Sequence, residues 1–158
     1  MNMLEIKDMF VENFEDELFT TAFKKYFGEI STSSRNWGML FRQMNAEKGT
    51  TRALISLCGN SVVGFIMFCE VELKCLFFVE KIGYIREFWV DSQFRGKGHG
   101  HRLLKKAEEY FYERNIKKTV LNATKGTEAF YIKNGYSKSH SIVSDNRNFF
   151  EKICYTKG

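Results

Sequence analysis

Apolar and polar residues follow two different periods along this chain. In residues 14–27 apolar side chains recur every four positions, which predicts a helix with one buried face, and residues 37–44 predict a second helix. Residues 52–58 and 62–73 are rich in apolar, β-branched and aromatic residues, and a short polar segment containing a glycine separates them. This second pattern predicts two strands joined by a hairpin turn.

The second half of the chain continues the succession of strands and helices. A strand-like run at residues 84–90 precedes the glycine-rich segment Arg95–Gly100. From Gly98 onward, apolar residues at positions 103, 104, 107, 110 and 111 form one stripe, which predicts an amphipathic helix packed on a sheet. Shorter elements are predicted as strands at residues 4–7, 119–123 and 149–155, and as a helix at residues 127–133.

Length and composition limit the class of protein. A chain of 158 residues with 44% hydrophobic content is expected to form one domain, residues 1–158, which buries roughly 70% of the surface of its unfolded chain. No apolar run approaches the ~20 residues that a membrane span requires, and the N-terminus lacks a secretory pattern. We therefore expect a cytoplasmic protein without a membrane partner.

Charge is distributed unevenly. Residues 95–118 carry eight basic and three acidic side chains, whereas the first thirty residues carry three basic and seven acidic ones. Such polarity suits a protein that holds a polyanion at one site and a cationic group at another. Solvated helix faces give similar counts by chance, so both interpretations stay open.

The glycine-rich segment between a strand and a helix predicts an anion site. The first N–H groups of a helix have no partner within the helix, and the helix dipole adds positive potential there. A dinucleotide fold would place its G-x-G-x-x-G turn after the first strand, and a P-loop would read G-x-x-x-x-G-K-S/T. Neither pattern fits this sequence, so a phosphate-bearing ligand of another class is predicted.

Two segments resemble the GNAT superfamily of acetyl-CoA-dependent N-acetyltransferases. Residues Val90–Leu104 resemble its phosphate-binding turn, R/Q-x-x-G-x-G/A, and Ala129–Tyr136 look like a second element of the same family. The resemblance is close from Tyr84 to Tyr136 and weak before Arg52. It implies an α/β (α+β) single-domain fold with a mixed, mostly antiparallel sheet of about six to seven strands flanked by about four helices.

The resemblance also implies a donor site. Acetyl-CoA is the implied cosubstrate, with no metal, and the backbone at Phe88 and Val90 is implied to pair with the pantetheine arm. Asn122 is a further candidate for a contact with pantetheine, because Gly126 stands where many members have an asparagine. The residues implied to hold the diphosphate are Arg95, Gly96, Lys97, Gly98, Gly100 and His101, with Arg102 as a further source of charge.

The implied reaction is direct attack of a primary amine on the thioester through a tetrahedral intermediate. Tyr131 occupies the family's acid position, where a phenol donates a proton to the leaving thiolate; the alternative is a packing tyrosine. Glu87 is the carboxylate within the strand that faces the thioester and is the candidate base. A chain of water molecules is the alternative base. The three histidines lack the spacing of metal ligands, so His99 is expected in a surface or packing role.

The sequence defines the acetyl acceptor less closely than the donor site. The acidic segment 12–17 favours a cationic acceptor, such as a small amine, a lysine side chain or a protein N-terminus. The alternatives are a catalytically inactive CoA-binding module and, less favoured, a nucleic-acid binder that uses the basic residues between 102 and 118. Residues 73–79 and the final strand are candidate surfaces for a homodimer.

Overall fold

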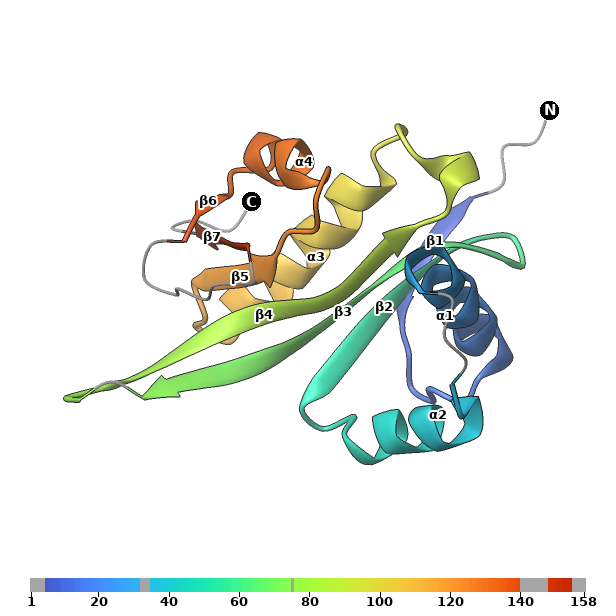
Figure 1. The fold of residues 1–158 in the computed structure, drawn as a ribbon, viewed down its shortest axis with the longest axis horizontal. Coiled ribbons are helices and arrows are strands. Elements are labelled where there is room, and N and C mark those ends of the chain that lie inside the picture. The colour runs from blue at the N-terminus through green and yellow to red at the C-terminus, as the bar shows by residue number, and fades with distance from the viewer. Residues whose placement is uncertain (1–4, 32–34, 75, 140–147, 155–158) are drawn as a thin grey trace. The chain divides into compact units, whose positions relative to one another are not determined.

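The computed structural model describes residues 5–31, 35–74, 76–139 and 148–154 (Figure 1). Within these ranges the strands are β1 (Ile6–Phe10), β2 (Thr51–Cys58), β3 (Ser61–Lys74), β4 (Val79–Val90), β5 (Lys118–Asn122), β6 (Ser137–Lys138) and β7 (Phe149–Ile153). The α-helices are α1 (Glu17–Ile30), α2 (Trp37–Ala46), α3 (His99–Tyr112) and α4 (Glu128–Lys133), and one 3-10 turn, η1, spans Ser92–Phe94. None of the helices in these ranges is long and apolar enough to cross a bilayer.

The strands form one mixed sheet in the order β1-β2-β3-β4-β5-β7-β6. The pairs β1·β2, β5·β7 and β6·β7 are antiparallel. The pair β4·β5 is parallel, with Gly83–Ile85 of β4 in register with Thr119–Leu121 of β5. This architecture confirms the predicted fold class, a mostly antiparallel sheet of seven strands with four helices among the described residues.

The chain divides into two compact units, and β3, β4 and α3 each contribute to both. The N-terminal unit comprises residues 1–67 and 87–103, and the C-terminal unit comprises residues 68–86 and 104–158. Because α3 begins at His99, its first turn belongs to the N-terminal unit. The prediction of a single domain stays a prediction, and each unit is described separately below.

Aromatic side chains build the core of the N-terminal unit. Asp16 caps α1 by accepting a hydrogen bond from the backbone N–H of Leu18 (3.0 Å), which satisfies one of the free donors at the helix start. The helix then buries Phe19 and Phe23, whose rings pack against Phe65 of β3 at centroid distances of 5.7 and 5.8 Å. The full cluster is Val11, Phe14, Phe19, Ala22, Phe23, Phe41, Ala53, Ile55, Leu57, Phe65, Met67 and Trp89.

The C-terminal unit is built around the apolar stripe of α3. Phe111 packs so close to β4 that a Cβ on Gly83 would lie 2.3 Å from its ring, so glycine is required there. The same unit buries the carboxylate of Glu108. The Tyr136 hydroxyl donates to this carboxylate at 2.7 Å and the Lys152 ammonium at 2.8 Å, so the buried charge is paired.

Most predicted elements are confirmed, with shifts at their ends. The first strand lies at Ile6–Phe10 rather than at residues 4–7, and the strand before the glycine turn starts at Val79, five residues earlier than predicted. The two-residue strand β6 has no counterpart in the prediction, because a pair of residues carries no periodicity. Residues 4 and 155, at two of the predicted strand ends, lie outside the described ranges.

The tip of the β3–β4 hairpin exposes consecutive apolar side chains. Figure 1 shows this tip running beyond β5, and the exposed fractions are 96% for Leu76, 94% for Phe77, 61% for Phe78 and 56% for Val79. Exposed apolar patches of this kind mark interaction surfaces. The homodimer stays a prediction, and this tip is its best candidate surface.

If the tip joins two copies, Phe77→Ser will convert a dimer into a monomer in sedimentation velocity. The substitution removes one phenylalanine ring from each of the two copies. Each such ring buries roughly 150–250 Å² when it is covered, so the contact between the copies loses much of its apolar area. The control is Met39→Ser on α2, another exposed apolar side chain (57%) that does not belong to the tip. A wild-type chain that sediments as a monomer at all concentrations contradicts the prediction.

Candidate active site

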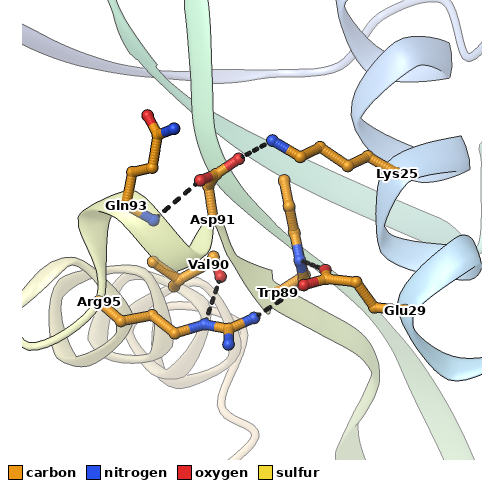
Figure 2. Close-up of polar contacts among 7 residues, drawn as sticks. All are labelled: Lys25, Glu29, Trp89, Val90, Asp91, Gln93 and Arg95. Carbon is orange, nitrogen blue, oxygen red and sulfur yellow. Dashed lines mark hydrogen bonds and ion pairs between the residues drawn. The ribbon is translucent and has the colours of Figure 1, made fainter.

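The last turns of α1 contact one face of the end of β4. Alternate residues of a strand point to the same face. Two such residues of β4, and Asp91 directly after it, each contact a side chain of α1. The Tyr26 hydroxyl donates to the Glu87 carboxylate, the Trp89 indole N–H donates to Glu29, and the Lys25 ammonium donates to Asp91. These contacts fix the end of β4 before the glycine-rich turn begins, as Figure 2 shows for the second and third of them.

Asp91 links this helix to the turn. It is 5% exposed, its backbone N–H donates to the Val63 carbonyl (2.7 Å), and its Oδ1 accepts from the Gln93 N–H (3.0 Å), which starts η1. The hydrogen bond from Lys25, followed by that from Gln93, holds the pKa of the Asp91 carboxyl below its ordinary value. The carboxylate is therefore charged at neutral pH and can bind both donors (Figure 2).

Arg95 closes the same network from the other side. Its Nε donates to the Val90 carbonyl (2.8 Å), and one terminal nitrogen lies 3.4 Å from Oε1 of Glu29, whose other oxygen, Oε2, accepts from Trp89 (Figure 2). The side chain of Arg95 is 54% exposed. Arg95, which was predicted to bind the diphosphate, therefore also anchors the end of β4, the strand segment predicted to contact pantetheine.

The glycine turn itself requires glycine for its backbone conformation. Gly96 and Gly98 have φ angles of +78° and +87°, a region that side chains with a Cβ rarely adopt. A Cβ at either position would meet no atom within 4 Å, so the requirement comes from conformation and leaves open space beside the turn. The Gly98 carbonyl accepts from Arg102 N–H (3.1 Å), which starts α3 and leaves the first amides of this helix available to an anion.

The guanidinium of Arg102 is bound within its own unit. Arg102 was expected to add charge near a diphosphate, and its guanidinium binds Asp8 of β1 through two hydrogen bonds (2.8 and 3.0 Å) and Ser56 of β2 at 2.6 Å. The Asp8 side chain is buried, so the pair is a structural link between α3 and the sheet of this unit. The contribution of Arg102 to the charge near a diphosphate stays a prediction. The sequence did not predict its two partners, because their strands come from distant parts of the chain.

His99 has a packing role, as expected. It is 9% exposed, its ring lies edge-on to Phe94 at 6.0 Å, and its Nδ1 is 2.8 Å from a guanidinium nitrogen of Arg102. Because arginine can only donate, Nδ1 of His99 accepts and is unprotonated. Burial, followed by the charge of Arg102, lowers the pKa of His99, so the ring is neutral at pH 7. The cations that stay exposed in the turn are Arg95 and Lys97, and His101 is also exposed.

Tyr131 lies in the C-terminal unit on α4. It is 9% exposed, and its ring packs edge-on against Phe130 (5.2 Å) and Tyr136 (5.8 Å). Burial raises the pKa of Tyr131 to about 12, so its hydroxyl keeps its proton at neutral pH. No side chain among the described residues forms a hydrogen bond with this hydroxyl, which leaves it available to a ligand.

The end of α4 fixes this tyrosine in place. The helix closes with hydrogen bonds from Tyr136 N–H to the Tyr131 carbonyl (2.9 Å) and from Gly135 N–H to the Ile132 carbonyl (3.0 Å). This pair is a Schellman motif, which needs a residue with positive φ, and Gly135 has φ +92°. The sequence Asn134-Gly135-Tyr136 therefore ends the helix directly after the candidate acid.

Asn122 has a structural contact of its own. Its Oδ1 accepts from the Asn148 N–H (2.9 Å) and so helps to pair β5 with β7. Only the amide NH₂ of Asn122 stays available for the predicted pantetheine contact. Gly126, at the position where an asparagine was expected, has φ +92°, a conformation that favours glycine.

The structure therefore distributes the predicted site residues over both units. Glu87, Phe88, Val90 and the turn 95–101 belong to the N-terminal unit, and Asn122 and Tyr131 belong to the C-terminal unit. Phe88 and Val90 are half-buried. Sequence reasoning missed Lys25, Tyr26 and Glu29, because their spacing on α1 indicates a helix face and says nothing of the strand that it contacts.

Comparison with known sequences identifies the family. The sequence profile described as the Acetyltransferase (GNAT) family matches residues 5–136, most of the chain. The chain belongs to the GNAT family of acetyltransferases. The resemblance stated from the two motifs is thereby confirmed, and the match extends it to the N-terminal helices.

One curated relative and several solved structures are similar to this chain in sequence or in fold. An uncharacterised N-acetyltransferase of Archaeoglobus fulgidus is 38% identical over 64 residues, a match that covers 40% of this chain and 43% of that protein, less than half its length. A predicted acetyltransferase of Clostridium acetobutylicum, solved with acetyl-CoA, superposes with a TM-score of 0.75 at 18% identity, over 90% of this chain and 96% of that one. An aminoglycoside acetyltransferase from an uncultured soil metagenomic sample, solved with sisomicin, gives 0.66 at 16% identity over 88% and 93%.

Proposed function

We propose that this GNAT protein is an N-acetyltransferase that moves the acetyl group of acetyl-CoA to a cationic primary amine. The observation that carries the proposal is the turn between β4 and α3. Two glycines with positive φ precede a helix N-terminus beside open space, and two exposed cations flank the turn. Backbone amides and positive charge at one point suit a diphosphate. The related Clostridium protein, solved with acetyl-CoA, supports this choice of ligand.

The turn and the end of β4 form the proposed donor site. The amides of residues 96–101 bind the diphosphate, with Arg95, Lys97 and His101 adding charge or hydrogen bonds. The backbone of Phe88 and Val90 pairs with pantetheine, and Asn122 contributes its amide NH₂. The contacts of α1 with Trp89 and Asp91 hold this strand end rigid, which suits a backbone that acts as a template.

The chemistry requires one base for the amine and one hydrogen-bond donor for the leaving sulfur. The amine nitrogen attacks the thioester carbonyl carbon, the C–S bond breaks from the tetrahedral intermediate, and the sulfur leaves as a thiolate. Glu87 takes the proton that the amine must lose, and Tyr131 donates a hydrogen bond to the thiolate. With a pKa of about 12, against ~8.5 for a thiol, the phenol stabilises the thiolate without giving up its proton completely.

A cationic acceptor is supported by the charges of the N-terminal unit. Glu12, Glu15 and Glu17 are exposed, and Glu87 is a half-buried carboxylate. A protonated amine is attracted to such groups before it loses its proton. The related aminoglycoside acetyltransferase solved with sisomicin is an example of a structurally similar protein with an aminoglycoside ligand. We place the protein in the cytoplasm, where acetyl-CoA is present, and expect no metal.

The function is tested by calorimetric titration with acetyl-CoA and then by free-thiol release with a panel of amines. We expect saturable binding and turnover with polyamines, aminoglycosides or peptide amines, and none with neutral or anionic acceptors. Binding without turnover on any amine supports the alternative, a CoA-binding module without catalysis. Absence of acetyl-CoA binding contradicts both, and a gel shift at low salt then tests for nucleic acid.

The turn offers a matched pair of variants for the binding step. Gly98→Ala is expected to weaken acetyl-CoA binding about tenfold, because a Cβ at φ +87° costs roughly 1–2 kcal/mol in this left-handed region. Gly49→Ala is the control, since a Cβ there also meets no atom within 4 Å and Gly49 has no positive φ. Calorimetry measures both. Equal affinities for the two variants would show that the turn does not hold the ligand.

A further inference from the structure

The carboxylate of Glu87 has an asymmetric environment. Its Oε2 accepts a hydrogen bond from the Tyr26 hydroxyl, which reaches it from α1 across 61 positions of sequence. Oε1 has no hydrogen-bond partner among the described residues. One oxygen is therefore anchored and the other is available, an arrangement that suits a base that must accept a proton at a fixed place.

Tyr26 is itself held in position by aromatic contacts. Its ring is half-buried and lies edge-on to Phe65 at 5.4 Å with an interplanar angle of 90°, and to Phe23 at 5.7 Å with an angle of 68°. Both phenylalanines belong to the core of the N-terminal unit. Few rotamers of Tyr26 fit between two such rings, so its hydroxyl is a donor of fixed direction.

The neighbouring contacts of α1 restrict Glu87 further. The other ionisable side chains that this face of α1 presents to β4 are Lys25 and Glu29, which are occupied by Asp91 and by Trp89 with Arg95. Because these contacts fix the backbone on the C-terminal side of Glu87, the carboxylate has little freedom to move with its strand. Tyr26 then determines which of its oxygens faces away from the helix.

We propose that Tyr26 is a positioning residue for the reaction, which holds Glu87 oriented so that its second oxygen receives the proton of the acceptor amine. Tyr26 does not touch the substrate and acts through Glu87. The inference rests on the proposed function, since it gives a partner to the base of that reaction. It assigns a role to a residue outside both motifs of the family resemblance.

The test is a double-mutant cycle on the full chain with an amine that the wild type acetylates. Tyr26→Phe keeps the ring and its packing and removes only the hydroxyl. We expect it to lower kcat about tenfold and leave KM for acetyl-CoA unchanged. Glu87→Gln on its own is expected to lower kcat about 100-fold. In that background Tyr26→Phe should have less than a twofold further effect, because residues that act as a unit are not additive.

The split between kcat and KM gives a readout that a structural role would not move. A displaced strand end would raise KM for acetyl-CoA as well as lower kcat, whereas loss of the phenol hydroxyl alone should lower kcat only. Tyr84→Phe is the control, because no described residue bonds to its hydroxyl, and its kcat and KM should match the wild type.

The outcomes separate this inference from the function on which it rests. A Tyr26→Phe loss of the same size in both backgrounds overturns the inference, because Tyr26 then acts independently of Glu87. Full activity of Tyr26→Phe beside a strong loss in Glu87→Gln also overturns it and leaves the base in place. Full activity of Glu87→Gln rejects the base and its partner together. Absence of turnover by the wild type on every amine rejects the proposed function itself.

Discussion

Tyr131→Phe is expected to lower kcat about 100-fold while acetyl-CoA binds within threefold of the wild type. The hydroxyl is the part of Tyr131 that is proposed to contact the leaving sulfur, and a positioned acid or hydrogen-bond donor contributes about 10²–10⁴ to a rate. The ring, which packs against Phe130 and Tyr136, is kept in the variant. Steady-state kinetics with the preferred amine and calorimetry with acetyl-CoA measure the two quantities.

The pH dependence of kcat gives a second test of the role of Tyr131. Since burial raises the pKa of Tyr131 to about 12, the phenol keeps its proton up to about pH 11, and its ionisation cannot reduce activity below that pH. A loss of kcat at pH 9 that disappears in Tyr131→Phe would contradict the role, because it would require an ionised phenol at that pH.

Tyr136→Phe is the matched contrast for Tyr131→Phe. Its hydroxyl donates to the buried carboxylate of Glu108, so its removal leaves an oxygen of Glu108 without that donor. The expected cost is about 1–3 kcal/mol of stability, with kcat within threefold of the wild type. Equal kinetic losses in the two variants would indicate that Tyr131 acts through packing alone.

The parts of the site that the sequence predicts are local in the chain. The turn 95–100 joins a strand to a helix, and its glycines report a backbone conformation that depends on no distant residue. The same holds for Tyr131, because Asn134 and Gly135 end its helix within one turn. Such features depend on residues a few positions apart, and periodicity and turn chemistry are read over that distance.

The contacts that hold the site in place are not local, and the sequence does not predict them. Tyr26 and Glu87 are 61 positions apart, and Arg102 and Asp8 are 94 apart. Charge counts indicated an acidic first segment and a basic turn, but they could not show that Arg102 is neutralised by Asp8 whereas Arg95 stays exposed. The packing of the whole aromatic core decides which face of a helix contacts which face of a strand. A pattern within one segment of the sequence cannot predict this.

Gly64→Ala is expected to lower the stability of the protein by about 2–3 kcal/mol, the upper part of the usual range of about 1–3 kcal/mol for overpacking a core. A Cβ on Gly64 would lie 2.4 Å from the Trp89 carbonyl oxygen and 3.1 Å from the Val90 Cα, so β3 or β4 must move. For a chain of this length the melting temperature should fall by roughly 4–12 °C. Gly28→Ala within α1 is the control, because a Cβ there meets no atom within 4 Å and alanine favours a helix.

The same variant tests how the fold supports the donor site. Trp89 and Val90 are the point where Glu29 and Arg95 hold the end of β4, so a displaced strand weakens these contacts and the backbone proposed for pantetheine. We therefore expect Gly64→Ala to weaken acetyl-CoA binding at a temperature where the variant is still folded, whereas Gly28→Ala binds normally and melts higher. A destabilised Gly64→Ala that binds acetyl-CoA as the wild type does would separate stability from the site. It would show that the ligand depends on the glycine turn and not on the position of the strand end.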